Sequence, residues 1–266
     1  MSSNTNKLLA SIQKIAKVHN TEVTAKKIDA ILKAGFADLH VITDFDGTVT
    51  KYYRNKEKKE RSPGSHLILS SSSRLTDEFK KKTKELVDKY YPIEVNNQLT
   101  EEQKWPYMIE WEGLRELIET CNEKKIPFLV FSAGVKNVIE EILIAEKLYH
   151  SNMHVVSNKM IFNPETGICD EFAEPLIHIF NKSEVAIKES YYHKTIEDRK
   201  NVILLGDSIG DLKMSSGVKH DVCLNIGFLN YDNDEVLKIY LEKFDIVVTG
   251  DGPMEVANMI LRAINH

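Results

Sequence analysis

Hydrophobic residues in the first part of the chain recur at helical spacing and then form a continuous run. The positions recur at helical spacing, which places them on one face of each of two helices: Leu8, Ile12 and Ile15, followed by Val23, Ile28, Ile31 and Leu32. Gly35 stands where the second helix should end. The apolar run LHVIT at 39–43 then has the length of a buried strand. The pattern predicts two helices before the first strand.

Further apolar runs predict strands that alternate with helices. One strand is followed by a loop and a helix, another enters a polar loop, a third precedes the last helix, and a hairpin lies between them. The segments are IPFLVFSAG at 126–134 with KNVIEEILIAEKL at 136–148, HVVSN at 154–158, the hairpin KMIFNPETG and ICDEF at 159–172, NVILLGDSIGDL at 201–212, FDIVVTGD at 244–251 and the helix at 254–264. This alternation predicts an α/β fold with a parallel sheet.

A change of composition after the first strand marks an insertion. The run KYYRNKEKKER at 51–61 is basic, and SPGSH at 62–66 and the serines at 70–73 are typical of an exposed connection. A charged helical pattern ends at Pro92, and another begins at Thr100, a plausible N-cap. We therefore expect a helical cap at 51–117, inserted into a core formed by 1–50 and 118–266.

The composition favours a small-molecule partner over nucleic acid or a membrane. The 266 residues carry 35 basic and 40 acidic side chains, a net charge of −5, and 42% are hydrophobic. Cys121, Cys169 and Cys223 lack CxxC spacing, which suits a reducing compartment and argues against a zinc site. The N-terminal segment lacks the continuous apolar stretch expected of a secretory signal, and no apolar run of about 18 residues occurs. We expect a cytoplasmic protein, with a monomer as the favoured state.

The motif DFDGTVT directly follows the first predicted strand. Asp44 is the candidate nucleophile toward phosphorus, and Asp46 can protonate the leaving oxygen and later activate water. Gly47 permits a sharp turn, and Thr48 adds a hydroxyl to the same loop. Acidic residues also commonly end strands, so the motif alone leaves an ordinary turn open.

Two further apolar runs end in polar groups, and loops at the carboxyl ends of parallel strands converge on ligands. Ser132 can donate its hydroxyl to a phosphate, with the amides of Ala133 and Gly134 at the start of the next helix; the alternative is a plain helix cap. Asp207 and the aspartates of the first motif offer the oxygen ligands that Mg²⁺ prefers, and Asp211 can face the same ion or support it. A turn with a capping aspartate is the alternative there.

The motifs DFDGT, FSAG, NK and GDSIGD, in this order, resemble the four motifs of the haloacid dehalogenase superfamily. The longer strings VITDFDGTVT, YYPIEV, PYMIEW, VILLGDSIGDLKM and IGFLN resemble the type III cytosolic pyrimidine 5'-nucleotidase family. This resemblance extends from about residue 20 to the C-terminus. It implies a Rossmann-like core with a helical cap, Mg²⁺ as cofactor, and hydrolysis of nucleoside 5'-monophosphates through an aspartyl-phosphate.

The resemblance also implies roles for individual residues. Asp44 becomes nucleophile and metal ligand, Asp46 the acid/base with its carbonyl on the metal, and Asp207 the third protein ligand. Ser132 and Lys182 become phosphate binders, with Asp211 in support, and Glu94 in YYPIEV becomes the cap carboxylate that recognises the nucleobase. Lysine is abundant in this chain, so Lys182 is selected by the resemblance alone.

The cap departs from the family pattern. After PYMIEW, the segment WEGLRELIETCNEKK leads almost directly to IPFLVFSAG, so the cap is expected to be shortened. Trp105, Tyr107 and Trp111 could stack on a base or form the cap's own core. Three other functions stay open: a phosphatase of another small phosphomonoester such as a sugar phosphate or phosphoserine, a non-catalytic relic that binds a polyanion, and phosphotransfer to a nucleoside instead of water.

Overall fold

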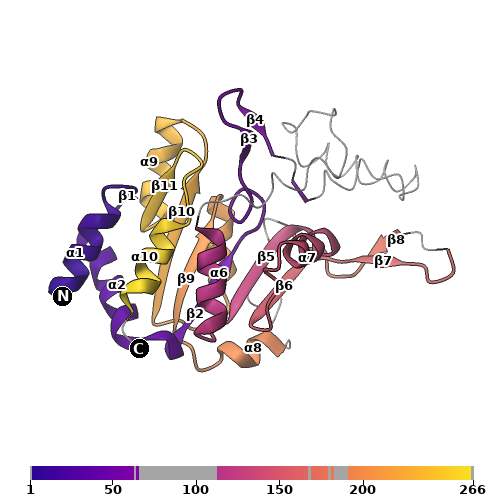
Figure 1. Ribbon diagram of the computed structural model, residues 1–266, viewed down its shortest axis with the longest axis horizontal. Coiled ribbons are helices and arrows are strands. Elements are labelled where there is room, and N and C mark those ends of the chain that lie inside the picture. The colour runs from indigo at the N-terminus through magenta and orange to yellow at the C-terminus, as the bar shows by residue number, and fades with distance from the viewer. Residues whose placement is uncertain are drawn as a thin grey trace.

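The computed structural model describes residues 2–62, 64–65, 113–166, 169–178, 181–182 and 191–264. Its centre is a seven-stranded sheet in the order β1-β11-β10-β9-β2-β5-β6 (Figure 1). All neighbouring strands are parallel except β1, which pairs antiparallel with β11. The strands are β1 Lys17–Val18, β2 Leu39–Thr43, β5 Phe128–Val135, β6 Met153–Asn158, β9 Asn201–Gly206, β10 Val222–Leu229 and β11 Ile246–Thr249. The predicted parallel α/β sheet is confirmed.

Helices of the described part of the chain pack over one face of this sheet (Figure 1). They are α1 Ser3–Ile12, α2 Thr21–Ala34, α6 Leu114–Glu123, α7 Lys136–Ala145 and α10 Glu255–Ala263. Their buried side chains form one core cluster with strand residues such as Val41, Ile203 and Ile226. Asn20 caps α2 by accepting a hydrogen bond from the Val23 amide, and Gly35 ends it at a φ of 78°.

The elements that cover the opposite face are α8 Tyr191–Ile196, the 3₁₀ helix η4 Ile209–Ser215 and α9 Asp234–Lys243. A second cluster lies between this layer and the sheet and includes Ile42, Leu204 and Met214. Because both faces are covered, every residue of β2 and β9 is buried. This explains why these strands appear in the sequence as continuous apolar runs.

Two hairpins extend from the core (Figure 1). The predicted hairpin is confirmed as β7 Met160–Phe162 paired with β8 Cys169–Phe172. The basic segment, expected to be a simple exposed connection, contains a second hairpin of β3 Tyr53–Asn55 and β4 Glu60–Arg61. This hairpin is fixed to the core because Asp251 accepts hydrogen bonds from the amides of Tyr52 and Tyr53.

The predicted cap lies mostly outside the described residues, and so do Pro92, Glu94, Thr100, Trp105, Tyr107 and Trp111. The helix α6 begins inside the predicted cap and contributes Leu114, Leu117 and Ile118 to the core cluster. The division into core and cap therefore stays a prediction. Two helices precede β2, as predicted, but the short strand β1 lies between them and was not predicted; Ile15 and Val23 are exposed.

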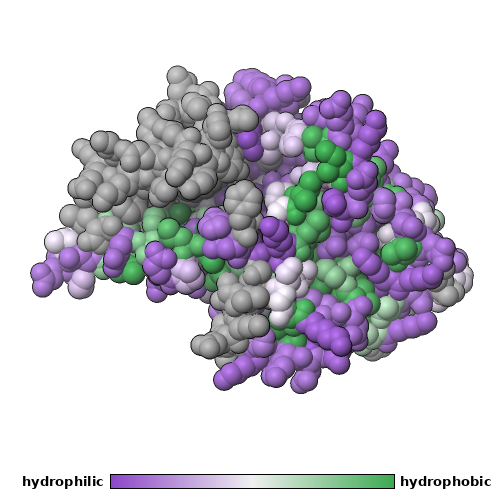
Figure 2. All heavy atoms as spheres, turned by 180° about the vertical axis from the view of Figure 1, so that it is seen from behind, coloured by the Kyte–Doolittle hydropathy of each residue, from purple (hydrophilic) through white to green (hydrophobic). Residues whose placement is uncertain are grey.

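The back view in Figure 2 shows mostly hydrophilic side chains over the described surface, with a short run of hydrophobic ones near the centre. None of the helices within the described ranges has the length and apolar character needed to cross a membrane.

Candidate active site

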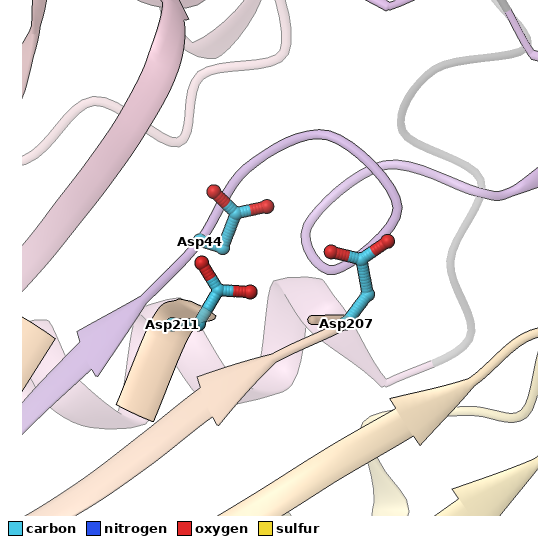
Figure 3. A group of neighbouring side chains, drawn as sticks. All are labelled: Asp44, Asp207 and Asp211. Carbon is cyan, nitrogen blue, oxygen red and sulfur yellow. The ribbon is translucent and has the colours of Figure 1, made fainter. Parts of the chain in front are cut away.

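Neighbouring parallel strands bring the two main acidic motifs together. β2 and β9 pair in parallel, and the amide of Asp44 donates to the carbonyl of Leu205 at 3.0 Å. Asp44 thus leaves β2 beside Asp207, which follows β9, while Asp211 lies on η4 (Figure 3). One carboxylate oxygen from each of these three residues lies within 4.8 Å of the others.

Lys182 forms two ion pairs inside this cluster. Its Nζ lies 2.5 Å from Oδ1 of Asp44 and 2.6 Å from Oδ1 of Asp211, and its side chain is 2% exposed. Burial alone would lower the pKa of Lys182, but the charges of Asp44 and Asp211 outweigh burial and raise that pKa above its usual value. Lys182 therefore stays cationic at the position that the sequence resemblance implied.

Asp211 holds Lys182 and also ends its own turn. Its Oδ2 accepts hydrogen bonds from the Ser208 amide at 2.9 Å and the Ser208 hydroxyl at 2.8 Å, which forms a capping box. Gly206 permits this approach, because a Cβ there would lie 2.5 Å from the Cβ of Asp211. Both oxygens of Asp211 thus have protein partners: Oδ1 pairs with Lys182, and Oδ2 caps the turn as the capping alternative has it.

The ionised forms of Asp44 and Asp207 are stabilised only in part by the protein around them. Burial raises the pKa of Asp44 to about 7, although Lys182 acts in the opposite direction. Asp207 is partly exposed as a residue, but burial of its carboxylate and then the charge of Asp44 raise its pKa well above the usual value. Two closely spaced carboxylates of this kind are suitable hard-oxygen ligands for a divalent cation.

Asp46 points toward β5 and is held by Ser65. The Ser65 amide donates to Oδ1 of Asp46 at 2.9 Å, and the Ser65 hydroxyl donates to Oδ2 at 2.7 Å. Ser65 is completely buried, although its segment SPGSH was expected to be exposed. Sequence reasoning missed this residue because a serine beside proline and glycine carries no signal of burial.

Ser132 and Gly134 lie at the end of β5, beside Asp46. Ser132 is buried, and its Oγ accepts a hydrogen bond from the Gly134 amide at 2.9 Å. A Cβ on Gly134 would lie 1.9 Å from Oγ of Ser65, 3.0 Å from Oδ2 of Asp46 and 3.1 Å from Oγ of Ser132. Glycine is therefore required here by the close approach of three polar groups.

The expected location of Ala133 and Gly134 at a helix start is wrong. After an irregularity in register, β5 continues to Val135, which pairs with Asn158 of β6, and α7 begins only at Lys136. Asn158 and Ser157 donate to the carbonyls of Ala133 and Gly134 at 2.8 and 2.6 Å. These bonds stabilise the strand conformation, so neither amide belongs to a helix N-terminus.

The loop after Asp46 is fixed by residues that the sequence did not indicate. Asn230, which follows β10, donates from Nδ2 to the carbonyl of Gly47 at 2.7 Å, and the Gly47 amide donates to Thr50. On α9, the hydroxyl of Tyr240 donates to the backbone carbonyl of Asp207. Thr48, a supporting candidate, is buried in this loop. Asn230 and Tyr240 thus hold the backbone of the two acidic motifs by hydrogen bonds to their carbonyl groups.

The arrangement suits displacement at a phosphoryl group. The buried carboxylate of Asp44 beside the cation of Lys182, neighbouring acidic oxygens that could hold a metal ion, the carboxylate of Asp46 and a serine hydroxyl all occur at one sheet edge. Glu94 lies outside the described residues, so its predicted position is not available for comparison with this group.

Comparison with known proteins identifies the family. The family described as Pyrimidine 5'-nucleotidase (UMPH-1) matches residues 47–112 and 112–265. The human 7-methylguanosine phosphate-specific 5'-nucleotidase is 36% identical over 268 aligned positions, covering 89% of this chain and 88% of that protein.

Solved structures agree with the sequence matches. The crystal structure of cytosolic 5'-nucleotidase IIIB bound to cytidine has a TM-score of 0.83 at 29% identity, covering 97% of this chain and 96% of that one. A HAD family hydrolase from Salmonella enterica has a TM-score of 0.52 at 12% identity, covering 86% and 73%, which is a likeness of fold alone. The chain therefore belongs to the pyrimidine 5'-nucleotidase (UMPH-1) family, with a haloacid dehalogenase-like fold, and is a 5'-nucleotidase.

Proposed function

We propose that this enzyme hydrolyses nucleoside 5'-monophosphates in a Mg²⁺-dependent reaction through an aspartyl-phosphate on Asp44. The observation that carries the proposal is the buried pair of Lys182 and Asp44 beside Asp207. A carboxylate held by hydrogen bonding on Oδ1 keeps its second oxygen available to attack phosphorus, and a fixed cation next to it attracts the phosphate.

In the first half of the reaction, Asp44 attacks the phosphorus and the bond to the 5' oxygen breaks. Asp46 gives its proton to that leaving oxygen, so the nucleoside departs as a neutral alcohol. Lys182 and the Ser132 hydroxyl bind the non-bridging phosphate oxygens and stabilise the charge that develops on them. The Gly134 and Ala133 amides are proposed to add hydrogen bonds from the end of β5.

In the second half, water attacks the phosphorus of the aspartyl-phosphate. Asp46, now ionised, takes a proton from this water, and the bond between phosphorus and the Asp44 oxygen breaks. Inorganic phosphate leaves, and both aspartates return to their starting states. Interception of the aspartyl-phosphate by a nucleoside hydroxyl would give phosphotransfer in place of hydrolysis.

Asp44, Asp207 and the backbone carbonyl of Asp46 are the proposed Mg²⁺ ligands. Their fit rests on the donor set: the carboxylates of Asp44 and Asp207 are hard oxygen ligands whose pKa values are raised by burial. When bound, Mg²⁺ would reduce the repulsion between the anionic nucleophile and the anionic substrate. Asp211 is left to Lys182 and Ser208, and Thr48 supports the loop.

The names of the relatives support the proposed substrate class. The family is named for pyrimidine nucleotides, and the human relative is named for 7-methylguanosine phosphate. The solved structure of cytosolic 5'-nucleotidase IIIB contains cytidine. We propose pyrimidine monophosphates such as UMP and CMP, and 7-methylguanosine monophosphate, as substrates, with Glu94 recognising the base. A cytoplasmic location and a monomeric state belong to the same proposal.

A shortened cap at 51–117 is also part of the proposal. The family match is split into two stretches that meet at residue 112. The human alignment spans 268 positions while covering 89% of a 266-residue chain, so the alignment opens gaps within this chain. Both observations support a deletion after PYMIEW, where the chain was expected to lack part of the cap.

The test is phosphate release from CMP, UMP, dTMP, AMP, GMP, 7-methyl-GMP and p-nitrophenyl phosphate, with Mg²⁺ or with EDTA. We expect Mg²⁺-dependent turnover of pyrimidine or 7-methylguanosine monophosphates, and loss of turnover in a folded Asp44→Asn variant. Turnover of p-nitrophenyl phosphate alone would support phosphomonoester hydrolysis but reject nucleotides as the substrates. A lack of turnover with all seven compounds would reject catalysis and favour the relic.

A further inference from the structure

Ser65 makes two hydrogen bonds to Asp46, the proposed acid/base, from a distant position in the sequence. Its backbone amide and its hydroxyl donate to the two different oxygens of the Asp46 carboxylate, at 2.9 and 2.7 Å. The residues are 19 positions apart, so this contact is made by the tertiary structure. A carboxylate held at both oxygens has a fixed orientation, because rotation about its terminal bond would break both hydrogen bonds.

The same hydroxyl also contacts β5. The amide of Val135 donates to Oγ of Ser65 at 3.3 Å. The absent Cβ of Gly134 makes room for this hydroxyl, since a Cβ there would lie 1.9 Å from it. Ser65 therefore joins Asp46 to the strand end that carries Ser132.

We propose that Ser65 is the positioning residue of the acid/base: it holds the Asp46 carboxylate against the end of β5, beside the bound phosphate. This inference rests on the proposed function, because it assigns Ser65 a role through Asp46. Ser65 itself does not touch the reacting atoms. It sets the direction in which Asp46 delivers its proton to the leaving oxygen and receives the proton of the attacking water.

A positioning role should depend on the leaving group. Expulsion of a nucleoside 5' oxygen needs a proton from Asp46, whereas p-nitrophenolate leaves without one. The ratio kcat/KM reports the steps up to loss of the leaving group. Misplacing a general acid by a fraction of an ångström reduces its contribution by about 10- to 100-fold.

The experiment compares Ser65→Ala with wild type on UMP, phenyl phosphate and p-nitrophenyl phosphate. We expect kcat/KM to fall about 10- to 100-fold for UMP and phenyl phosphate and less than about 3-fold for p-nitrophenyl phosphate. Ser65→Thr, which keeps the hydroxyl, should recover most of the loss. Ser62→Ala is the matched control, because Ser62 precedes Ser65 by three residues and its hydroxyl has no hydrogen-bond partner among the described residues.

A double-mutant cycle separates positioning from simple structural support. If Ser65 acts through Asp46, adding Ser65→Ala to Asp46→Asn should lower kcat/KM by less than about 2-fold. Equal losses on all three substrates, full additivity in the cycle, or wild-type activity of Ser65→Ala would each overturn the inference. Circular dichroism and thermal unfolding check the fold, and Ser65→Gly replaces Ser65→Ala if the alanine variant is unfolded.

Failure of the proposed function is distinguishable from failure of this inference. If wild type turns over none of the nucleotides in the panel but hydrolyses the two aryl phosphates, the nucleotide assignment fails while the comparison of leaving groups still tests Ser65. If wild type turns over UMP and Ser65→Ala behaves like wild type, the positioning role fails and the nucleotidase stands.

Discussion

Gly47 and Asp207 are in such close contact that a side chain on the first would displace the second. A Cβ on Gly47 would lie 2.6 Å from Oδ2 of Asp207, and Gly47 adopts a φ of 79°. The glycine of DFDGT therefore has two functions. It turns the chain after Asp46, and it leaves space for a carboxylate that arrives from a distant strand.

Gly47→Ala should reduce activity beyond what backbone strain explains. The positive φ destabilises the fold by about 1–2 kcal/mol with any L-residue. The clash with Asp207 adds displacement of a proposed metal ligand, and we expect kcat/KM to fall at least about 100-fold. Steady-state kinetics at several Mg²⁺ concentrations, with thermal unfolding, measure both effects.

Gly250→Ala is the matched control for Gly47→Ala. Gly250 has a φ of 70°, but the nearest atom to a Cβ there is Nζ of Lys56 at 3.8 Å. It should show the same loss of stability with near-normal activity. Equal activities in the two variants would contradict a steric link between Gly47 and Asp207.

The sequence predicted the strands that are buried on both faces and missed one that is interrupted. β2, β5 and β9 are continuous apolar runs because helices cover both sides of the sheet. β10, VCLNIGFL, contains Asn225 and Gly227, and it was not predicted. Gly227 is there because the ring of Phe244 lies 2.6 Å from the position of a Cβ. That requirement comes from a distant residue, so no local pattern reveals it.

The same distinction applies to the site. Asp44, Asp207 and Ser132 were predictable because each follows or ends an apolar run, and parallel strands bring such positions together. Ser65 and Tyr240 were not, because their contacts depend on how a connection and a helix pack onto the core. The helix α9 was also missed. Tyr240 alone is buried among its ten described residues.

Lys182→Met should abolish activity and destabilise the fold. It removes the cation from two buried carboxylates, so Asp44 and Asp211 lose a shared partner. Breaking a buried ion pair by removing one member costs about 3–5 kcal/mol. Phosphate release and chemical denaturation at pH 7 measure the two effects.

Lys27→Met provides the comparison, because Lys27 pairs with Asp245 at 2.7 Å with a side chain that is 29% exposed. Loss of this more solvated pair should cost about 1 kcal/mol or less and leave activity unchanged. A Lys182→Met variant as stable as Lys27→Met would show that the buried pair contributes little to folding.

Tyr240→Phe should lower the affinity of the enzyme for Mg²⁺ more than it lowers the stability of the fold. It removes the hydroxyl that holds the Asp207 carbonyl while keeping the ring, which packs on Phe244. We expect a loss of about 1 kcal/mol in stability and a several-fold higher Mg²⁺ concentration for half-maximal activity and for half-maximal thermal stabilisation. Tyr149→Phe is the control, because the hydroxyl of Tyr149 donates to Glu140 on an exposed surface. Equal Mg²⁺ responses in the two variants would rule out a role for Tyr240 at Asp207.

His40 should make the fold sensitive to mild acid. It is fully buried on β2, where Tyr192 contacts its Nδ1 at 3.3 Å. Burial, and then the charges of His220 and Arg199, lower the pKa of His40 well below its usual value. An unfolded chain takes up this proton near pH 6.5, and the folded protein only at lower pH. The contribution of neutral His40 to the free energy of unfolding is therefore fully present above about pH 6.5, and it is lost as the pH drops toward about 5.

His40→Leu removes this group from the titration, so its unfolding free energy should fall less between pH 7.5 and pH 5 than that of wild type. His154, whose pKa is also lowered by burial, leaves part of the slope in place. His19→Leu, at an exposed histidine, is the control variant. Urea denaturation at half-unit pH steps gives the slopes, and parallel curves for wild type and His40→Leu would mean that His40 takes up its proton equally in the folded and unfolded states.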